Sequence, residues 1–319
     1  MITFPIITDT QVFANWRAKP ENWQAYIKDI ARSENVSADA LAPYQTGTNL
    51  VVDLNGSVVL KLFPPLYRNQ FVSERTTLRL LDGKLSVPIP QIIAEGDRDG
   101  WAYLIMTRLH GILGSVAWPT LAEPQKERVL REIGRTIADV QSVVPGELAT
   151  IEPSWPNFIT GQVVGCVERH RRQGLASGLL SDLEVLLQDV PATVPLYASP
   201  VILTGEWIPE NFLLAEEQGQ WRLAALIDFG DVMTGWREYD LLGPSAFMCA
   251  GLPNRVRSLL EGYGLEPKAL GAEMRRRLLT LMVLHRASDL RHIYIEGWEA
   301  RIGSLFDLEN IIWPIEASC

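Results

Sequence analysis

The apolar residues of this 319-residue chain change their prevailing spacing near residue 110, and that change restricts the folds open to it. Up to about residue 110 many of them fall in short β-rich runs separated by turn residues such as Asn55-Gly56. Beyond that point they recur every three to four residues over long stretches, as in amphipathic helices. Strands followed by helices predict an α+β fold. We therefore expect two lobes, a β-rich one at 1–108 and a mainly helical one at 109–319.

The same spacing predicts the elements within each lobe. In the first lobe we expect helices over 20–36 and 68–81, a hairpin of strands 48–52 and 57–63, and an antiparallel pair at 92–94 and 101–106. In the second lobe we expect a helix from an N-cap at Thr120 to about 143, two helices within 161–189, and further helices from 253 to near 313. Three short apolar runs predict one small buried β segment formed by 201–203, 212–214 and 221–227.

The composition limits the partners of the chain. It has 38 Asp and Glu against 29 Lys and Arg, a formal net charge of -9, whereas binding to phosphate backbones needs a basic face. The three cysteines, Cys166, Cys249 and Cys319, are too widely spaced for a disulfide framework or a zinc site. No signal-peptide pattern opens the chain, and the apolar run 278–284 is too short to span a membrane. We therefore expect a cytoplasmic protein that binds neither nucleic acid nor membranes.

Polar side chains gather where the short strands of the second lobe end. Glu206 and Asn211 follow the run 201–203, and Asp228 follows the run 221–227. Carboxylate and amide oxygens of this kind suit Mg²⁺, which takes a few protein ligands and keeps water or phosphate for the rest. Glu206 could accept a proton from a substrate hydroxyl. An ordinary turn after each strand is the simpler interpretation of either motif alone.

The first lobe supplies groups that suit a phosphate. Gln45–Asn49 form a polar turn that contains Thr46 and Gly47, and backbone N–H groups in such a turn can approach phosphate oxygens. Lys61 lies inside an apolar strand, where an unpaired ammonium would be costly. Glu74 on the following helix is the expected partner of Lys61. A strand-edge lysine facing solvent is the alternative.

Taken in order, these motifs resemble a known family of enzymes. A glycine turn, a strand lysine, a helix glutamate, the linker 103–111, Glu206 to Asn211 and Asp228-Phe229-Gly230 follow the order of parts in kinases. The version in this chain is similar to the aminoglycoside phosphotransferase and choline kinase group, and the similarity covers about 41–245. The resemblance implies a protein-kinase-like bilobal fold, Mg²⁺ and ATP or GTP as cofactors, and a small-molecule hydroxyl as acceptor. It further implies a place among antibiotic-resistance kinases.

The resemblance also assigns a role to individual residues. It implies that the glycine turn and the buried ion pair hold the phosphates, that the linker meets the adenine edge, and that the strand ends bind the metal. The residues concerned are Thr46, Gly47, Lys61 and Glu74 for the phosphates, Met106, Thr107 and Leu109 for the adenine, Asn211 and Asp228 for Mg²⁺, and Glu206 as the catalytic carboxylate.

Two segments depart from the family pattern. The usual His-Gly-Asp loop is Thr204-Gly205-Glu206 in this chain, and a helix that often ends in Leu-His ends in Val140-Gln141. Glu206 is one methylene longer than the usual aspartate, and small misplacements can slow phosphoryl transfer on the order of 10²-fold. We expect a kinase with Glu206 as its base, with a nucleotide-binding pseudokinase as the alternative. Transfer of a nucleotidyl unit is a third hypothesis.

Charge and histidine placement bear on the acceptor. Residues 1–110 contain 11 basic and 11 acidic residues, whereas residues 111–319 contain 18 and 27, so the second lobe carries the whole excess. An acidic lobe attracts cationic substrates. With the resemblance, this favours an aminoglycoside or another amino-bearing metabolite. For His285 and His292 we expect a surface or capping role, and for Trp207 a contact with substrate.

Overall fold

A computed structural model describes residues 3–314, and Cys319 lies outside them. The described chain divides into two compact units. The first consists of residues 3–83, 88–110 and 227–231, and the second consists of residues 84–87, 111–226 and 232–314. The first unit therefore includes the segment around Asp228, which comes late in the chain.

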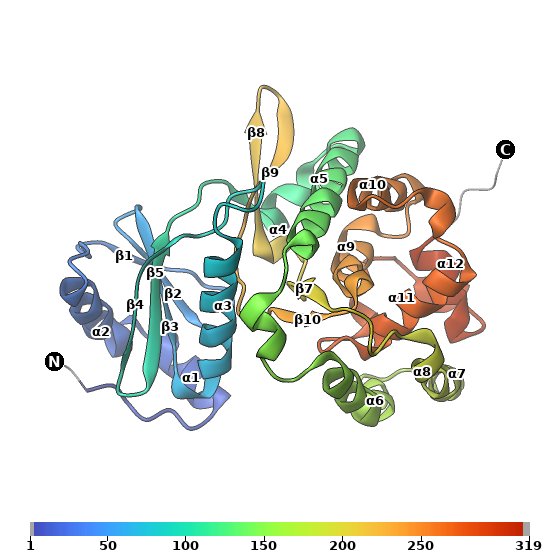
Figure 1. Cartoon of the computed structure of the whole chain (residues 1–319), viewed down its shortest axis with the longest axis horizontal. Coiled ribbons are helices and arrows are strands. Elements are labelled where there is room, and N and C mark those ends of the chain that lie inside the picture. The colour runs from blue at the N-terminus through green and yellow to red at the C-terminus, as the bar shows by residue number, and fades with distance from the viewer. Residues whose placement is uncertain (1–2, 315–319) are drawn as a thin grey trace. The chain divides into compact units, whose positions relative to one another are not determined.

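The first unit is built on a five-stranded antiparallel sheet in the order β1-β2-β3-β5-β4 (Figure 1). Its strands are β1 (Leu41–Pro43), β2 (Leu50–Leu54), β3 (Val58–Phe63), β4 (Ile92–Arg98) and β5 (Trp101–Thr107). The predicted hairpin is confirmed, since Leu54 pairs with Val58. Asn55 and Gly56 make the connection with φ values of +57° and +71°, a left-handed backbone that these two residue types tolerate.

Three helices flank this sheet, α1 (Thr10–Arg17), α2 (Pro20–Ser33) and α3 (Arg68–Leu81). Figure 1 shows α2 and α3 on opposite faces. The sequence does not predict α1, because Phe13 is its one buried residue and the apolar pattern is weak. Its start is nevertheless encoded, since the side chain of Asp9 accepts a hydrogen bond from the N–H of Val12. The expected helix over 20–36 ends at Ser33, three residues early.

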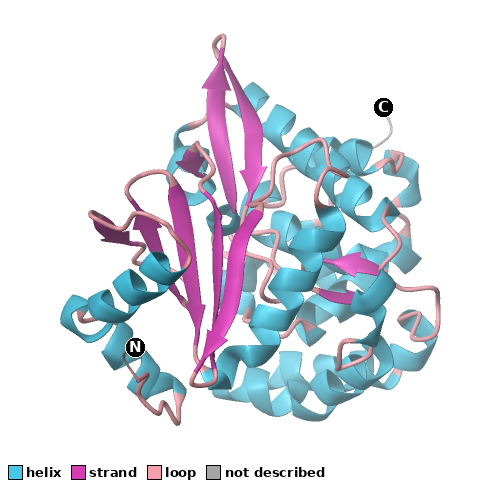
Figure 2. Cartoon of the chain, turned by 60° about the vertical axis from the view of Figure 1, so that its left-hand side comes forward, coloured by secondary structure: helices cyan, strands magenta, loops and turns pink. Residues whose placement is uncertain are grey.

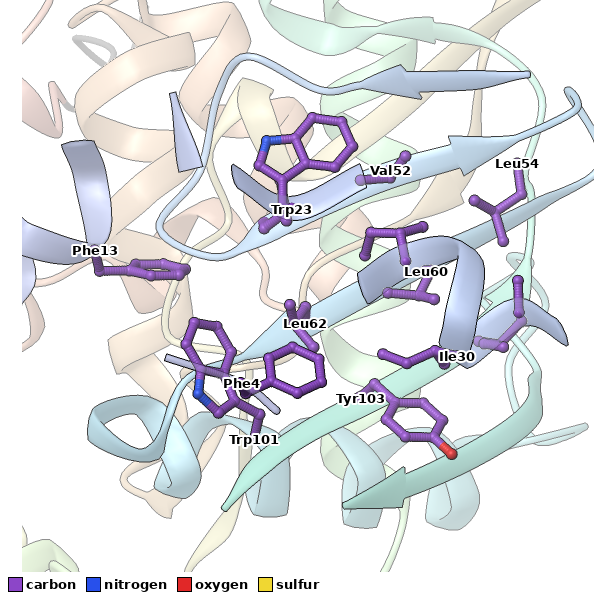
Figure 3. Close-up of a cluster of buried hydrophobic side chains, with 14 of the residues drawn as sticks. Phe4, Phe13, Trp23, Ile30, Val52, Leu54, Leu60, Leu62, Trp101 and Tyr103 are labelled. Carbon is purple, nitrogen blue, oxygen red and sulfur yellow. The ribbon is translucent and has the colours of Figure 1, made fainter. Parts of the chain in front are cut away.

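Alternation along the strands divides the side chains between the two faces of the sheet. Leu60 and Leu62 of β3 belong to a buried apolar cluster with Trp23 and Ile30 of α2 (Figure 3). The intervening Lys61 and the following Phe63 point to the other face, where Phe63 meets Phe71 of α3 at 5.6 Å between ring centroids. Lys61 is therefore directed at α3 by the pleat of the strand.

The second unit is mainly helical. Its longer helices are α5 (Glu123–Ser142), α6 (Trp155–Arg172), α7 (Ser177–Gln188), α10 (Pro253–Tyr263) and α11 (Ala272–Leu284). Short helices are α4 (Gly114–Ala117), α8 (Val190–Thr193), α9 (Leu242–Pro244) and α12 (Leu308–Ile312). Helices α5 and α10 approach so closely that a methyl group on Gly134 would lie 2.2 Å from the carbonyl oxygen of Leu259. No helix among residues 3–314 has the length and apolar character to cross a membrane.

The strands of the second unit correct one prediction. The three runs do not form one segment: β7 (Val201–Leu203) pairs with β10 (Met233–Gly235), whereas β8 (Phe212–Glu217) pairs with β9 (Gln220–Leu226) and β6 (Ile112–Leu113). The short β7–β10 pair lies among helices in Figure 2. A 3₁₀ turn at Pro209–Asn211 separates β7 from β8, and a proline cannot donate a sheet hydrogen bond.

Two helix starts in the second unit also differ from expectation. Thr120 is not the N-cap of α5: its hydroxyl donates to the carbonyl of Ala117, and α5 begins at Glu123 with Pro124 in its first turn. Helix α6 starts at Trp155, six residues before the expected range, again with a proline in its first turn. Proline is favoured there because the first N–H groups of a helix have no partner inside it.

Candidate active site

A buried ion pair lies at the centre of the first unit. The ammonium Nζ of Lys61 on β3 lies 2.6 Å from a carboxylate oxygen of Glu74 on α3, and the two side chains are 5% and 2% exposed. The expected partnership of these residues is therefore present, and the solvent-facing alternative for Lys61 is wrong. A pair this deep is held by the mutual neutralisation of its charges, because either charge alone would be expensive to bury.

Asp228 is a second partner of the same ammonium. Its Oδ1 lies 2.8 Å from Nζ of Lys61, yet its side chain remains 40% exposed. Asp228 has a φ of +64°, a left-handed conformation that is uncommon outside glycine and costs free energy. The turn after β9 thus directs the Asp228 carboxylate toward Lys61 while leaving part of it open to other cations.

The charges of Lys61, Glu74 and Asp228 shift one another's pKa values. Burial lowers the pKa of Lys61, but the charges of Asp228 and Glu74 outweigh burial and raise it above its ordinary value. Burial raises the pKa of Glu74, and the charge of Lys61 opposes that rise. The charge of Lys61 lowers the pKa of Asp228 despite burial. Lys61 is therefore a permanent cation at neutral pH and Asp228 a permanent anion.

The predicted phosphate turn is tied to α1. Gly47 has a φ of +89° with open space around its α-carbon, and the guanidinium of Arg17 donates to the carbonyls of Gly47 and Asn49. The side chain of Asn49 also donates to Oε1 of Gln70 on α3 at 2.7 Å. Thr46 is exposed beside Gly47. Arg17 was not foreseen from the sequence, because it lies thirty residues before the turn in a helix that the apolar pattern misses.

The linker residues occupy the end of β5. Met106 is buried and pairs with Val59 of β3, while Leu109 follows the strand and is partly exposed. The N–H of Thr107 donates to the carbonyl of Gln91 at 2.9 Å, so it is already engaged within the first unit. A contact from Thr107 to a base edge would therefore have to come from its carbonyl oxygen.

In the second unit, the loop that carries Glu206 is held from two directions. The carboxylate of Asp240 accepts the N–H groups of Thr204 at 3.1 Å and Gly205 at 2.9 Å. Nε2 of His285 lies 3.0 Å from the carbonyl oxygen of Gly205. Gly205 itself has a φ of +76°, which few other residues would adopt at that turn. The backbone just before Glu206 is thus bonded on both its N–H and its carbonyl side.

His285 is half-buried, so the expected surface role is wrong, whereas the expected capping role agrees with its place as the C-cap residue of α11. It directly follows α11, its ring stacks on Tyr239 with centroids 4.8 Å apart, and burial lowers its pKa to about 4. The neutral ring has one proton, and the carbonyl of Gly205 requires it on Nε2. Nδ1 then accepts the N–H of Ala287 at 3.2 Å. The sequence places His285 eighty residues from the loop, and no local pattern indicates their contact.

Gln141, one of the residues that depart from the family pattern described above, belongs to a separate buried network. Its Oε1 accepts the hydroxyl of Tyr263 at 2.7 Å, and its Nε2 donates to the carbonyl of Arg237 at 2.8 Å. Arg237 lies in the turn that leads to Asp240. Gln141 therefore supports the segment that positions Asp240.

Glu206 and Asn211 come together within the second unit. The amide nitrogen of Asn211 donates to the backbone carbonyl of Glu206 at 3.1 Å and to its carboxylate at 3.3 Å. The amide oxygen of Asn211 is therefore the atom that could ligate a metal. Asp228, the other predicted metal ligand, belongs to the first unit.

Two of the predicted residues offer oxygen donors that suit Mg²⁺, one in each unit. Among residues 3–314 no group of three or more His, Cys, Asp or Glu side chains is placed to hold a metal by itself. Asp228 provides an ionised, partly exposed carboxylate and Asn211 an amide oxygen. Each is an oxygen donor of the kind that Mg²⁺ takes, since this ion uses one or two protein ligands and completes its shell with phosphate and water.

A cavity of about 420 Å³ opens beside Glu206 in the second unit. Gly205, Glu206 and Glu210 line it on the loop side, and His285 and Ser288 line it after α11. Trp207, which we expected to meet substrate, is instead 3% exposed and absent from this lining. The volume is in the range of small-molecule sites.

Comparisons with known proteins identify the family that the chain resembles. The model of a family described as "Phosphotransferase enzyme family" matches residues 46–278. No curated protein matches the chain.

Solved structures share the fold. Wild-type aminoglycoside 2'-phosphotransferase-IIIa in its GDP complex is 22% identical with a TM-score of 0.69, covering 90% of this chain and 98% of that one. A streptomycin–ATP complex of APH(2")-IIa is 18% identical with a TM-score of 0.59, covering 86% and 94%. Macrolide 2'-phosphotransferase MphH from Brachybacterium faecium is 19% identical with a TM-score of 0.56, covering 85% and 100%. The expected α+β, protein-kinase-like fold is therefore confirmed. Because the family model spans well over half of the chain, this protein belongs to the phosphotransferase enzyme family and is a kinase-type enzyme.

Proposed function

We propose that this enzyme transfers the γ-phosphoryl group of Mg-ATP, or of Mg-GTP, to a hydroxyl of a small molecule held in the cavity beside Glu206. The observation that carries the proposal is the buried Lys61 between Glu74 and Asp228, in a chain of the phosphotransferase family. A permanent cation next to an open carboxylate suits a phosphate and its metal. We assign nucleotide binding to lobe 1–108 and acceptor binding to lobe 109–319.

In this proposal the first lobe binds the nucleotide. Lys61 holds the α- and β-phosphates and is oriented by Glu74, and Thr46 and Gly47 present backbone N–H groups to the phosphates. Met106 and Leu109, with the carbonyl of Thr107, meet the base. The nucleotides named for the solved relatives, GDP and ATP, support both candidate donors.

Asn211 and Asp228 would hold the metal. When bound, Mg²⁺ would neutralise charge on the phosphates and on the nucleoside diphosphate that leaves when the γ-phosphoryl group is transferred. The sparse oxygen donors and the lowered pKa of the Asp228 carboxyl support this assignment.

Glu206 would act on the acceptor. The acceptor oxygen forms a bond to the γ-phosphorus, the bond from that phosphorus to the bridging oxygen breaks, and the hydroxyl proton passes to the Glu206 carboxylate. Its position in the cavity lining and its bond from Asn211 support this role. Phosphoryl transfer depends mainly on such positioning.

For the acceptor we propose an aminoglycoside or another amino-bearing metabolite. Relatives crystallised with kanamycin, streptomycin and gentamicin support this class, and so does the acidic character of residues 111–319. We place the reaction in the cytoplasm, since Cys166 and Cys249 are free thiols.

A nucleotide-binding pseudokinase is the second candidate. Glu206 in place of the family aspartate, and Thr204 in place of the loop histidine, favour it. One experiment separates the candidates: purified enzyme is incubated with Mg-ATP and a panel of hydroxylated amines, and product masses are measured. Phosphorylated product supports the kinase. Nucleotide binding without any product supports the pseudokinase, and a product mass increased by a nucleotidyl unit supports the third hypothesis.

A further inference from the structure

The cavity beside Glu206 has a mainly apolar wall. It is formed by side chains from the α9 region, from α11 and from the segment after α11. Six of them carry the inference: Leu242, Ala246, Phe247, Met282, Ile293 and Tyr294. A cavity of this lining attracts ligands by burying their apolar surface.

A backbone hydrogen bond and an aromatic contact hold the apolar wall in place. Ala246 and Phe247 lie on a π-helical turn, Ser245–Cys249, a rare feature that is frequent at functional sites. The N–H of Tyr294 donates to the carbonyl of Ala246 at 2.9 Å, and the ring of Tyr294 meets that of Phe247 edge to face at 5.2 Å. Tyr294 is nevertheless 61% exposed. An aromatic pair held open to solvent in this way offers its faces to a ligand.

The cavity has few carboxylates for cations. Glu206, Glu210 and Asp289 are the acidic residues in its lining. Asp289 is already bonded to the guanidinium of Arg291 at 2.6 and 2.9 Å, so its charge is neutralised locally. Glu206 is assigned to the reacting hydroxyl. Glu210, which is exposed and forms no ion pair among residues 3–314, is the carboxylate left for an amine.

One polar group in the lining lacks a partner. Ser288 is buried, and its hydroxyl Oγ has no hydrogen-bond partner among the described residues. A buried hydroxyl without a partner is unfavourable, and a ligand oxygen or nitrogen would satisfy it. Besides Glu206, Asp289 and the histidines His285 and His292, the cavity therefore offers one available carboxylate, that of Glu210, and one hydroxyl, that of Ser288, in a mainly apolar surface.

From this inventory we infer that the acceptor is an alcohol with an apolar body and one amine, rather than a polycationic amino sugar. This inference rests on the proposed function and narrows its acceptor class. A single ammonium can pair with Glu210 while the body of the molecule covers Phe247 and Tyr294. Each additional ammonium would be desolvated against an apolar wall without a counter-charge, which is costly.

The test compares two acceptors with the full chain and Mg-ATP. Erythromycin, a macrolide with one tertiary amine, represents the inferred class, and kanamycin represents polycationic amino sugars. We expect kcat/KM for erythromycin to exceed that for kanamycin by at least about tenfold, because burying an ammonium group without a counter-charge is costly. Calorimetric titration of each acceptor into the enzyme supplies a readout that does not depend on transfer.

Variants at the aromatic wall sharpen the test. Tyr294→Ser removes an exposed ring, so the fold should tolerate it, and we expect KM for erythromycin to rise about tenfold with kcat unchanged. Tyr197→Ser is the matched control, because Tyr197 is 89% exposed and does not line the cavity. It should leave both constants unchanged.

The possible results distinguish the inferred acceptor class from the proposed phosphoryl transfer. If kanamycin is phosphorylated at least as efficiently as erythromycin, the inferred acceptor class, an alcohol with an apolar body and one amine, is overturned. The proposed phosphoryl transfer then stands. If erythromycin binds and kanamycin does not, but neither is phosphorylated, the inferred ligand class stands and the proposed phosphoryl transfer is overturned. If neither acceptor binds or reacts, both are overturned.

Discussion

The ring nitrogen Nε2 of His285 lies 3.0 Å from the carbonyl oxygen of Gly205, the residue directly before Glu206. This contact joins the end of α11 to the loop that carries the proposed base. The N–H of Gly205 is bonded at the same time to Asp240. We therefore expect His285 to act as a positioning residue for this loop, in which Thr204 stands at the position of the histidine in the family pattern.

Replacing His285 should slow turnover through the loop. We expect His285→Leu to lower kcat by about 10²-fold with little change in KM for the nucleotide, since misplacing a catalytic group costs about that much. His285→Gln, which retains a donor, should recover part of the loss. Steady-state kinetics of both variants measure kcat and the KM for the nucleotide separately.

His170 provides the matched control. It is buried, and its Nε2 lies 3.1 Å from a backbone carbonyl, but that carbonyl belongs to Val283 on α11 rather than to the loop. His170→Leu should destabilise the fold and leave kcat of the folded fraction unchanged. Equal loss of kcat in both leucine variants would mean that His285 has only a structural role.

His285 should also make stability depend on pH. Burial lowers its pKa to about 4; the Gly205 carbonyl opposes this shift, whereas Arg286 and Arg169 add to it. The unfolded chain therefore binds a proton at this residue near pH 6.5, whereas the folded chain does not. The contribution of neutral His285 to stability is complete above about pH 6.5 and is lost as pH falls toward 4.

Urea unfolding at pH 7 and pH 5 measures this dependence. The free energy of unfolding should fall more steeply from pH 7 to pH 5 in the wild type than in His285→Gln. Subtracting the two curves removes the contributions of other groups, including Asp240, whose pKa burial raises to about 6. Parallel curves would show that His285 is not buried as a neutral ring.

Removing Lys61 should separate stability from nucleotide binding. Lys61→Met leaves the Glu74 carboxylate buried without its cation, and we expect a loss of about 3 kcal/mol in the free energy of unfolding. The double variant Lys61→Met/Glu74→Met replaces the pair with apolar side chains and should recover most of that stability. Neither variant should bind Mg-ATP in calorimetric titration. Nucleotide binding by the double variant would show that Lys61 does not hold the phosphates.

Changes at Glu206 should test its role and its length. Glu206→Gln should lower kcat by on the order of 10³-fold while Mg-ATP still binds, because a positioned base contributes 10² to 10⁴-fold. Glu206→Asp keeps the charge but withdraws it by one methylene. Asp240 and His285 hold the preceding backbone, so the loop cannot advance, and kcat should fall on the order of 10²-fold. Wild-type turnover by Glu206→Asp would show that the loop adjusts freely.

The close approach of α5 and α10 predicts intolerance at Gly134. Gly134→Ala would place its methyl 2.2 Å from the Leu259 carbonyl oxygen and should cost about 2 kcal/mol of unfolding free energy. Gly165→Ala on α6, where nothing lies within 4 Å, is the control and should stabilise by about 0.5 kcal/mol. Thermal and urea unfolding compare the two. Equal effects would mean that the helices separate readily.

Local patterns in the sequence predict most elements of the first unit because each depends on near neighbours. The Asn55-Gly56 turn, the alternation of β3 and the period of α3 are enough to place Lys61 opposite Glu74. The weak apolar pattern of α1 hides that helix, although Asp9 caps it. Strand pairing in the second unit is not local, since β7 pairs with β10 across thirty residues, and so the predicted β segment is wrong.

The sequence by itself determined the two kinds of architecture, the order of the kinase motifs and the Lys61–Glu74 pair, since spacing and hydropathy report on local structure and burial. Only the tertiary structure decided what braces Gly205 and what lines the cavity beside Glu206. His285, Asp240, Phe247 and Tyr294 reach these positions through contacts between residues far apart in the chain. The packing of helices selects such contacts, and no periodicity in the sequence encodes them.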